Sequence, residues 1–210
     1  MSQEAEESRA RAKLYALCAQ MVAREPSLEF LQELKGAALF EIAEGLGLSP
    51  PPIPDPGEVE PVFESLRAEH ARLFVLPGTP LRPYESVQRG EERLWGEATV
   101  AVQQAYGEAG FILEPGAGQV PDHLAVELEF MSQLALQEAE KCETGMSQEA
   151  EALRESQRSF LREHLGTWAP GLARAIKNET REPYFRFVAE MLATVMESDR
   201  DFFGIGPEGA

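Results

Sequence analysis

The sequence predicts an all-helical protein that folds as one compact domain. Apolar residues recur every three or four positions through most of the chain, which is the period of an amphipathic helix. No stretch alternates apolar and polar residues as a half-buried strand does. With 210 residues, 43% of them hydrophobic, the chain can bury a sizeable core. We therefore expect a single helical domain over residues 1–198 and a flexible tail over residues 199–210.

In the N-terminal quarter of the chain, the sequence pattern predicts three helices and a loop. Residues 4–24 carry apolar side chains at helical spacing, and residues 31–42 predict a pair of shorter helices that ends near Gly45 and Gly47. The segment SPPPIPDPG follows at residues 49–57. Its prolines lack amide donors and bias the backbone toward an extended form, so we expect a surface loop there.

The middle of the chain predicts two further helices separated by a segment rich in Pro and Gly. Residues 59–74 form an amphipathic pattern, with His70 on the apolar side, where a lone histidine is most often a packed core residue. The pattern runs into LPGTPLRPYESV at residues 76–87. Residues 97–109 predict the next helix, and the Gly-rich segment GAGQV follows at residues 116–120.

The C-terminal half predicts four more helices, at residues 122–143, 147–164, 172–177 and 183–198. The last of these gathers large apolar side chains on one face, which is more typical of a core helix than of a cofactor site. These residues are Tyr184, Phe187, Val188, Met191, Leu192 and Val195.

The segment PDHLAVELEF, residues 121–130, places two polar side chains on an apolar helix face. His123 and Glu127 are four residues apart and share a stripe with Phe130 and Leu134, so we expect a direct histidine–carboxylate contact. A buried carboxylate is costly unless it is paired or hydrogen-bonded. The pattern fits a structural polar pair in the core, a solvated pair at the surface, or a functional site.

The charge of the chain narrows the class of partner. The chain carries 36 acidic and 19 basic residues, for a formal net charge of −17. Such a charge repels phosphate backbones and anionic lipids, so we expect neither nucleic acid nor stable membrane insertion. A basic partner would be attracted, although an acidic surface also serves solubility. The sequence shows neither a run of apolar residues long enough to span a bilayer nor a secretory leader, so we expect a cytoplasmic protein.

Sequence signatures of common enzymes are absent. The chain has no GxxxxGK, GxSxG or HExxH motif and no ExxH pair. Cys18 and Cys142 lie in helical patterns and suggest packing rather than disulfide or metal chemistry. We expect no cofactor and no metal, with one alternative: a small helical metal-dependent enzyme that uses Asp122, His123 and Glu127.

Three features point to a peptide-binding surface instead. These are the polar helix start at Asp122, the proline-rich loop with Tyr84, and an acidic stretch at residues 122–155 that holds nine Asp or Glu against two Lys or Arg. Carboxylates can accept bidentate contacts from arginine, and aromatic and leucine side chains supply apolar area. The combination favours a basic, partly apolar peptide as the ligand.

Two segments carry a resemblance to a known family. LFVLPGTPLRPYESV at residues 73–87 and VPDHLAVELEFMSQLA at residues 120–135, with a predicted helix between them, resemble the two signature segments of the TorD/DmsD/NarJ family of redox-enzyme maturation chaperones. The length, the acidity and the lack of strands are also similar. Motif agreement covers roughly residues 60–140.

The resemblance implies an all-helical cytoplasmic chaperone, not an enzyme. Such a protein binds the twin-arginine signal peptide of a molybdoenzyme precursor and delays its export until the molybdenum cofactor is inserted. Carried over to this chain, the peptide-binding residues are Leu73, Phe74, Pro83, Tyr84, Glu85, Asp122 and His123. Because a helix start favours anions, arginine binding there requires that Asp122 cap the helix with one carboxylate oxygen and present the other, or that acids from elsewhere, such as Glu85, share the peptide. The alternative is that Asp122 only caps the helix.

Overall fold

The computed structural model describes residues 2–23, 25–35, 37–53, 59–76, 78–79, 81–91, 95–113 and 120–206. Within these ranges every regular element is helical, which confirms the predicted all-helical class. Tyr84 and His123 form one isolated antiparallel bridge. The elements are α1 (Gln3–Ala23), α2 (Leu28–Leu34), α3 (Ala37–Gly45), α4 (Val59–His70), the π-helical turn η1 (Ala71–Val75), α5 (Glu85–Gln88), α6 (Glu97–Glu108), α7 (Leu124–Glu143), α8 (Ser147–Glu163), α9 (Leu165–Glu179) and α10 (Pro183–Phe202).

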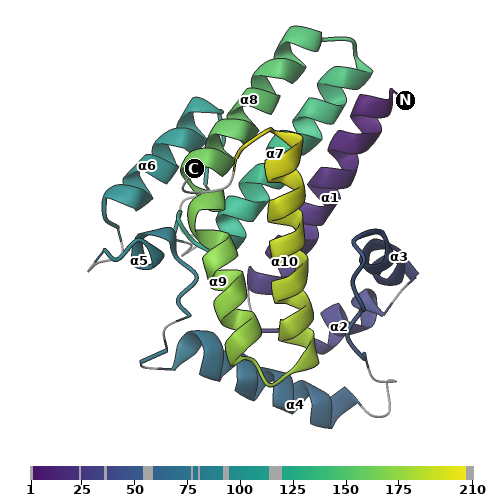
Figure 1. The fold of residues 1–210 in the computed structure, drawn as a ribbon, viewed down its shortest axis with the longest axis vertical. Helices are drawn as coiled ribbons and strands as arrows, with labels where there is room; N and C mark the ends of the chain where they lie inside the picture. Colours follow the sequence, from purple (N-terminus) through teal and green to yellow (C-terminus); the bar gives the residue numbers. More distant parts are fainter. Residues whose placement is uncertain are drawn as a thin grey trace.

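The centre of the molecule is built on α7. This helix packs against α1 along most of its length and against α8, while α10 packs on α9 and α1 (Figure 1). Small side chains allow the close approach of α1 and α7, and the Ser132 hydroxyl donates a hydrogen bond to the Ala12 carbonyl at 2.9 Å. The buried face of α7 includes Phe130, Met131 and Leu134, so the predicted apolar arc is the core face.

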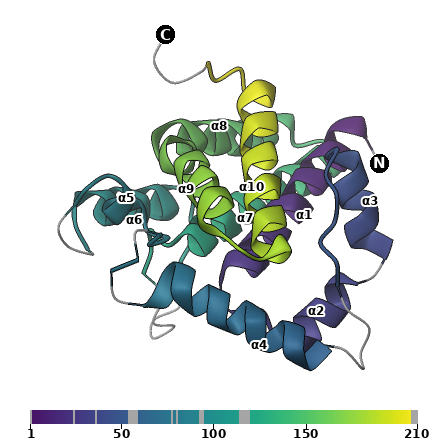
Figure 2. The same cartoon turned by 60° about the horizontal axis from the view of Figure 1, so that its bottom comes forward.

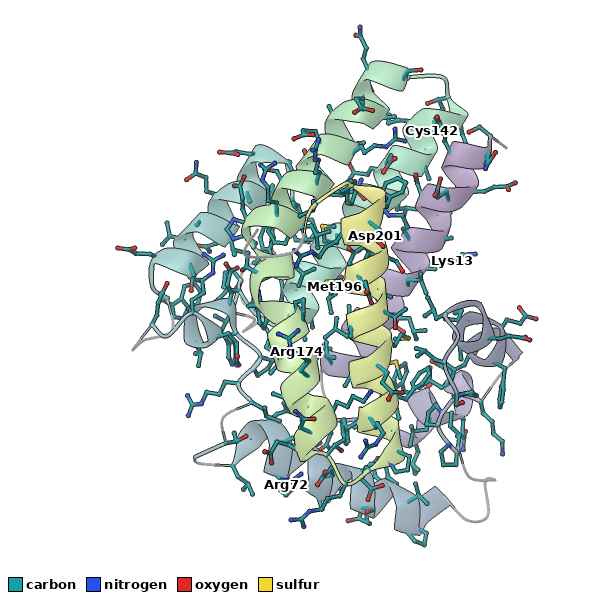
Figure 3. The ribbon with its side chains drawn as sticks, viewed as in Figure 1. Lys13, Arg72, Cys142, Arg174, Met196 and Asp201 are labelled. Carbon is teal, nitrogen blue, oxygen red and sulfur yellow. The ribbon has the colours of Figure 1, made fainter. Side chains whose placement is uncertain are left out.

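The shorter helices lie around this bundle. α4 crosses the end of α9 and α10, and α2 and α3 lie on the side of α1 opposite to α5 and α6 (Figures 1 and 2). Charged side chains such as Lys13, Arg174 and Asp201 lie on exposed helix faces (Figure 3). None of the helices in the described ranges is long and apolar enough to cross a membrane.

The predicted boundary after residue 198 falls inside a helix. α10 continues to Phe202, and Asp199 is buried against Arg11, whose Nε and Nη2 donate to its carboxylate at 2.9 and 2.8 Å. Phe203 is also buried. A residue-by-residue reading could not foresee this pairing because Arg11 belongs to the other end of the chain. Residues 207–210 of the expected tail lie outside the described residues.

The predicted short helix at 172–177 is part of the longer α9, which contains Pro170. α8 and α9 meet at a sharp bend at His164, whose backbone lies outside the helical region. Gly166 permits this bend, because a Cβ atom there would lie 2.3 Å from the Leu161 carbonyl oxygen. The predicted loop at 49–57 is non-helical through Ile53, whereas residues 54–57 and 116–119 lie outside the described residues.

Candidate functional site

The two signature segments lie against each other in the fold. The Leu124 amide donates to the Pro83 carbonyl at 2.8 Å, and the Glu85 amide donates to the Asp122 carbonyl at 2.9 Å. The rings of Tyr84 and His123 meet edge to face, with centroids 5.1 Å apart. Segments far apart in sequence therefore form one continuous structure.

Asp122 supports α5 instead of capping α7. Its side chain is completely buried, and Oδ2 accepts a hydrogen bond from the Ser86 amide at 2.9 Å, in the first turn of α5. Oδ1 has no hydrogen-bond partner within the described residues. The expectation that Asp122 caps α7 and presents its second oxygen to a peptide is therefore wrong, because neither oxygen reaches the surface.

His123 takes the capping role that we assigned to Asp122. Its Nδ1 accepts a hydrogen bond from the Ala125 amide at 3.1 Å, and its backbone is extended, as in an N-cap residue. Burial lowers the pKa of His123 to about 4, so the imidazole is neutral near pH 7 and keeps the lone pair that accepts this bond. Its ring remains partly exposed beside Tyr84.

Glu127 is buried as the apolar arc implied, but its partners differ from the prediction. The Trp168 indole Nε1 donates to Glu127 Oε2 at 3.2 Å, and Oε1 has no hydrogen-bond partner among the described residues. His123, already engaged at the start of α7, does not serve as its partner. Burial raises the pKa of Glu127 well above its ordinary value, and the neighbouring Glu85 adds to the shift. Because two neighbouring buried carboxyl groups do not both ionise readily, we infer that Glu127 and Glu85 share one proton, carried by Glu127.

Glu85 connects this pair to the bend between α8 and α9. Its buried carboxylate forms an ion pair with Arg89, with Oε1 2.7 Å from Arg89 Nη2, and both oxygens lie 3.2 Å from His164 Nδ1. Arg89 also donates to the Glu163 carbonyl and, at 3.1 Å, to the Thr167 hydroxyl. We call Glu85, Asp122 and Glu127 the carboxylate cluster; it joins α5, α7 and the α8–α9 bend. The spacing of residues in the sequence did not identify Arg89, His164 or Trp168 as part of the site.

The apolar residues of the first signature segment divide between core and surface. Leu73 is buried in the core, so its assignment as a peptide contact is wrong. Phe74 is half-buried, with its ring 5.3 Å from His70 and 6.0 Å from Phe185. The next two side chains, Val75 and Leu76, are 65% and 52% exposed. The sequence reading missed them because it continued a regular helix through a π-helical turn.

The metal-site alternative finds no support in this geometry. Asp122 faces Ser86, His123 faces Ala125, and Glu127 faces Trp168 and Glu85. Throughout the described ranges, no three His, Cys, Asp or Glu side chains converge as metal ligands do. The arrangement joins two backbone segments and leaves Tyr84 and His123 partly exposed at their junction.

Comparison with known proteins agrees with the resemblance seen in the sequence. The profile of the family described as nitrate reductase delta subunit matches residues 28–174. The chaperone protein TorD of Photobacterium profundum is 26% identical over 205 residues, covering 91% of this chain and 93% of that protein.

Two further relatives and one solved structure are similar over most of the chain. The chlorate reductase assembly chaperone of Ideonella dechloratans is 30% identical and covers 72% of this chain and 78% of its own. The selenate reductase assembly chaperone of Thauera selenatis is 34% identical, and the match covers 70% of this chain and 76% of that protein. A structure named as a redox enzyme maturation protein from Archaeoglobus fulgidus shares the fold, with a TM-score of 0.51, 21% identity, and coverage of 92% and 93%. The chain therefore belongs to the nitrate reductase delta subunit family, whose members are redox-enzyme maturation chaperones.

Proposed function

We propose that this protein is a cytoplasmic chaperone for the catalytic subunit of a molybdenum-containing redox enzyme. It binds the twin-arginine signal peptide of the precursor and delays export until the cofactor is inserted. The observation that carries the proposal is the backbone pairing of the two signature segments at Tyr84 and His123, in a chain that belongs to this family. The assembly roles named for the relatives support a precursor as the partner.

The joined segments offer an apolar surface of the kind that a signal peptide needs. Phe74, Tyr84 and His123 are partly exposed, and Val75 and Leu76 extend the apolar area along the same segment. Thr79 folds the chain back after η1, because its hydroxyl donates to the Leu73 carbonyl and accepts from the Leu81 amide at 3.3 Å. Pro83 is buried, so the prediction that it contacts the peptide is wrong. Glu85 and Asp122 hold this surface in place from inside.

Calorimetric titration with a synthetic signal peptide tests the proposal. We expect binding, and weaker binding by a peptide in which both arginines are replaced by lysine, because lysine loses the planar fork of donors. Tyr84→Ala should weaken binding through lost apolar contact while leaving the thermal melt nearly unchanged, since the ring is partly exposed. If the parent protein binds neither peptide, the proposal that it binds a signal peptide is wrong.

A further inference from the structure

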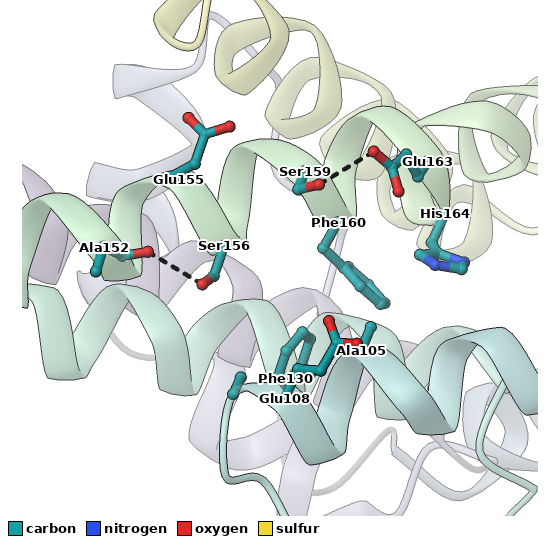
Figure 4. A pocket seen from close by; sticks show the side chains of 11 residues that line it. Ala105, Glu108, Phe130, Ala152, Glu155, Ser156, Ser159, Phe160, Glu163 and His164 are labelled. Atoms are coloured by element: carbon teal, nitrogen blue, oxygen red, sulfur yellow. Dashed lines mark hydrogen bonds between the residues drawn. The ribbon is translucent and has the colours of Figure 1, made fainter.

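A groove lies between α6 and α8, beside the joined signature segments. It encloses about 420 Å³ and has the rings of Phe130 and Phe160, 4.8 Å apart, in its floor (Figure 4). Small side chains line the two walls and leave the space open. These are Ala105 and Ala109 on α6 and Ala152, Ser156 and Ser159 on α8.

The charged residues that line this groove are all acidic. Glu108 lines the groove on α6, and Glu155 and Glu163 line it on α8. No lysine or arginine is among the lining residues. All three are exposed. Glu163 is paired with the neighbouring Arg162 at 2.6 Å, and Glu155 lies 3.6 Å from Arg158. Such exposed pairs contribute little to stability, so a cationic ligand can replace the arginine in them.

His164 connects the groove to the carboxylate cluster. The side chain lines the groove, is only 8% exposed, and places Nδ1 at 3.2 Å from both Glu85 oxygens. In the tautomer whose Nδ1 donates to Glu85, Nε2 is an acceptor, and no hydrogen-bond partner of Nε2 occurs among the described residues. A nearly buried acceptor at the end of an acidic groove suits an N–H donor from a ligand.

The cluster itself cannot receive the ligand's arginines, because Glu85, Asp122 and Glu127 are all 0% exposed. Surface carboxylates must do so, and those of the groove adjoin the cluster through His164. We propose that the groove between α6 and α8 binds a cationic, partly apolar peptide segment, with guanidinium groups at Glu108 and Glu163 and an apolar side chain over Phe130 and Phe160. The proposal rests on the proposed function and assigns the arginine-bearing part of the signal peptide to this groove.

A second acidic hollow provides a matched control. It lies between α1 and α2, away from the signature segments, and its lining includes Glu25, Glu29 and Phe30. Glu25 is paired with Arg67 at 3.3 Å, as Glu163 is with Arg162. The variants Glu108→Gln/Glu163→Gln and Glu25→Gln/Glu29→Gln therefore change the net charge equally, and each breaks one exposed ion pair.

Calorimetric titration of both variants with the twin-arginine peptide tests the groove. The groove variant loses two charge-assisted contacts, each worth about tenfold, so we expect it to bind about a hundredfold more weakly than the parent, whereas the control should bind nearly as the parent does. Ser156→Trp, which fills the groove without changing charge, should abolish binding. Circular dichroism melts establish that each variant is folded.

The outcomes separate the two proposals. If the parent binds the peptide and the groove variant and Ser156→Trp bind equally well, the groove proposal is wrong and the proposed function stands. If the groove variant and the control variant bind the peptide equally weakly, the groove proposal is also wrong, because such a result would show general charge attraction. If the parent does not bind, both proposals fail together.

Discussion

At the scale of single residues, the buried Glu127 explains how a carboxyl group is tolerated in an apolar helix face. Burying an ionised carboxylate without a partner is costly. Here burial and the nearby Glu85 raise the pKa of Glu127, which favours its protonated form, and the group accepts a hydrogen bond from Trp168. The group therefore acts as a neutral connector between α7, α5 and α9.

This state predicts a pH-dependent gain in stability for Glu127→Gln. The folded state keeps a proton that the unfolded chain releases above the ordinary pKa of 4.5, so the parent loses stability as pH rises above that value. The loss reaches up to about 1.4 kcal/mol per pH unit until the raised folded pKa is passed. Glutamine keeps an acceptor for Trp168 and a donor for Glu85 but carries no titrating proton. Urea unfolding of both proteins from pH 5 to 8 should show their stability difference shifting steadily in favour of the variant.

Glu129 provides the control for this measurement. It lies exposed on the same helix, so Glu129→Gln should follow the pH profile of the parent. If the stability of Glu127→Gln also follows the pH profile of the parent, Glu127 is ionised in the folded protein and the inference of a shared proton is wrong.

At the scale of helices, α5 illustrates what the sequence could and could not predict. The long helices follow from apolar periodicity, so α1, α4, α6, α7, α8 and α10 were expected near their observed positions. α5 has only four residues, too few for a period to show, and Asp122 and Glu127 fix it from another part of the chain. Its place depends on tertiary contacts.

The candidate site was predicted in part for the same reason. The spacing of PDHLAVELEF placed Glu127 on the apolar face of the helix, which the structure buries, and the signature segments indicated two backbone regions that lie together. The side-chain partners could not be read locally. Trp168 and His164 come from the α8–α9 bend, which depends on the missing Cβ of Gly166, and nothing in the spacing near residue 127 indicates them.

The position of α10 leads to a second prediction. Arg11 on α1 holds Asp199 near the end of α10 and lies 4.5 and 4.6 Å from the ring centroids of Phe202 and Phe203. Asp199→Ala leaves this buried guanidinium without its main partner. We expect a loss of roughly 3 kcal/mol in the free energy of unfolding, the lower end for a broken buried pair, because Glu138 and Gln157 still contact Arg11.

An exposed pair between α1 and α7 gives the comparison for Asp199→Ala. Arg9 Nη2 lies 2.7 Å from Glu143, with both side chains partly exposed. Glu143→Ala should leave the unfolding midpoint in urea almost unchanged, since solvent screens exposed pairs. Equal, small effects of the two substitutions would show that residues after 198 contribute little to stability, as a flexible tail would.

At the scale of the whole molecule, the net charge of −17 and the local groove act on different steps of binding. Long-range attraction raises the rate at which a cationic peptide arrives, and salt weakens it. Local contacts determine how long the peptide stays, so most effects of contact mutations appear in the dissociation rate. An acidic surface and an acidic groove can therefore be distinguished by kinetics even where their affinities overlap.

The two double variants make this distinction measurable, because Glu108→Gln/Glu163→Gln and Glu25→Gln/Glu29→Gln both change the net charge from −17 to −15. We expect both to slow association of a labelled twin-arginine peptide to the same small extent. The difference in association rate between the parent and the variants should shrink near 0.15 M salt, where the Debye length is about 8 Å. Only the groove variant should dissociate faster, because it alone lacks contacts made in the complex. Stopped-flow fluorescence at low and physiological salt measures both rates. Identical dissociation rates for the two variants would mean that the arginines of the bound peptide lie elsewhere on the acidic surface.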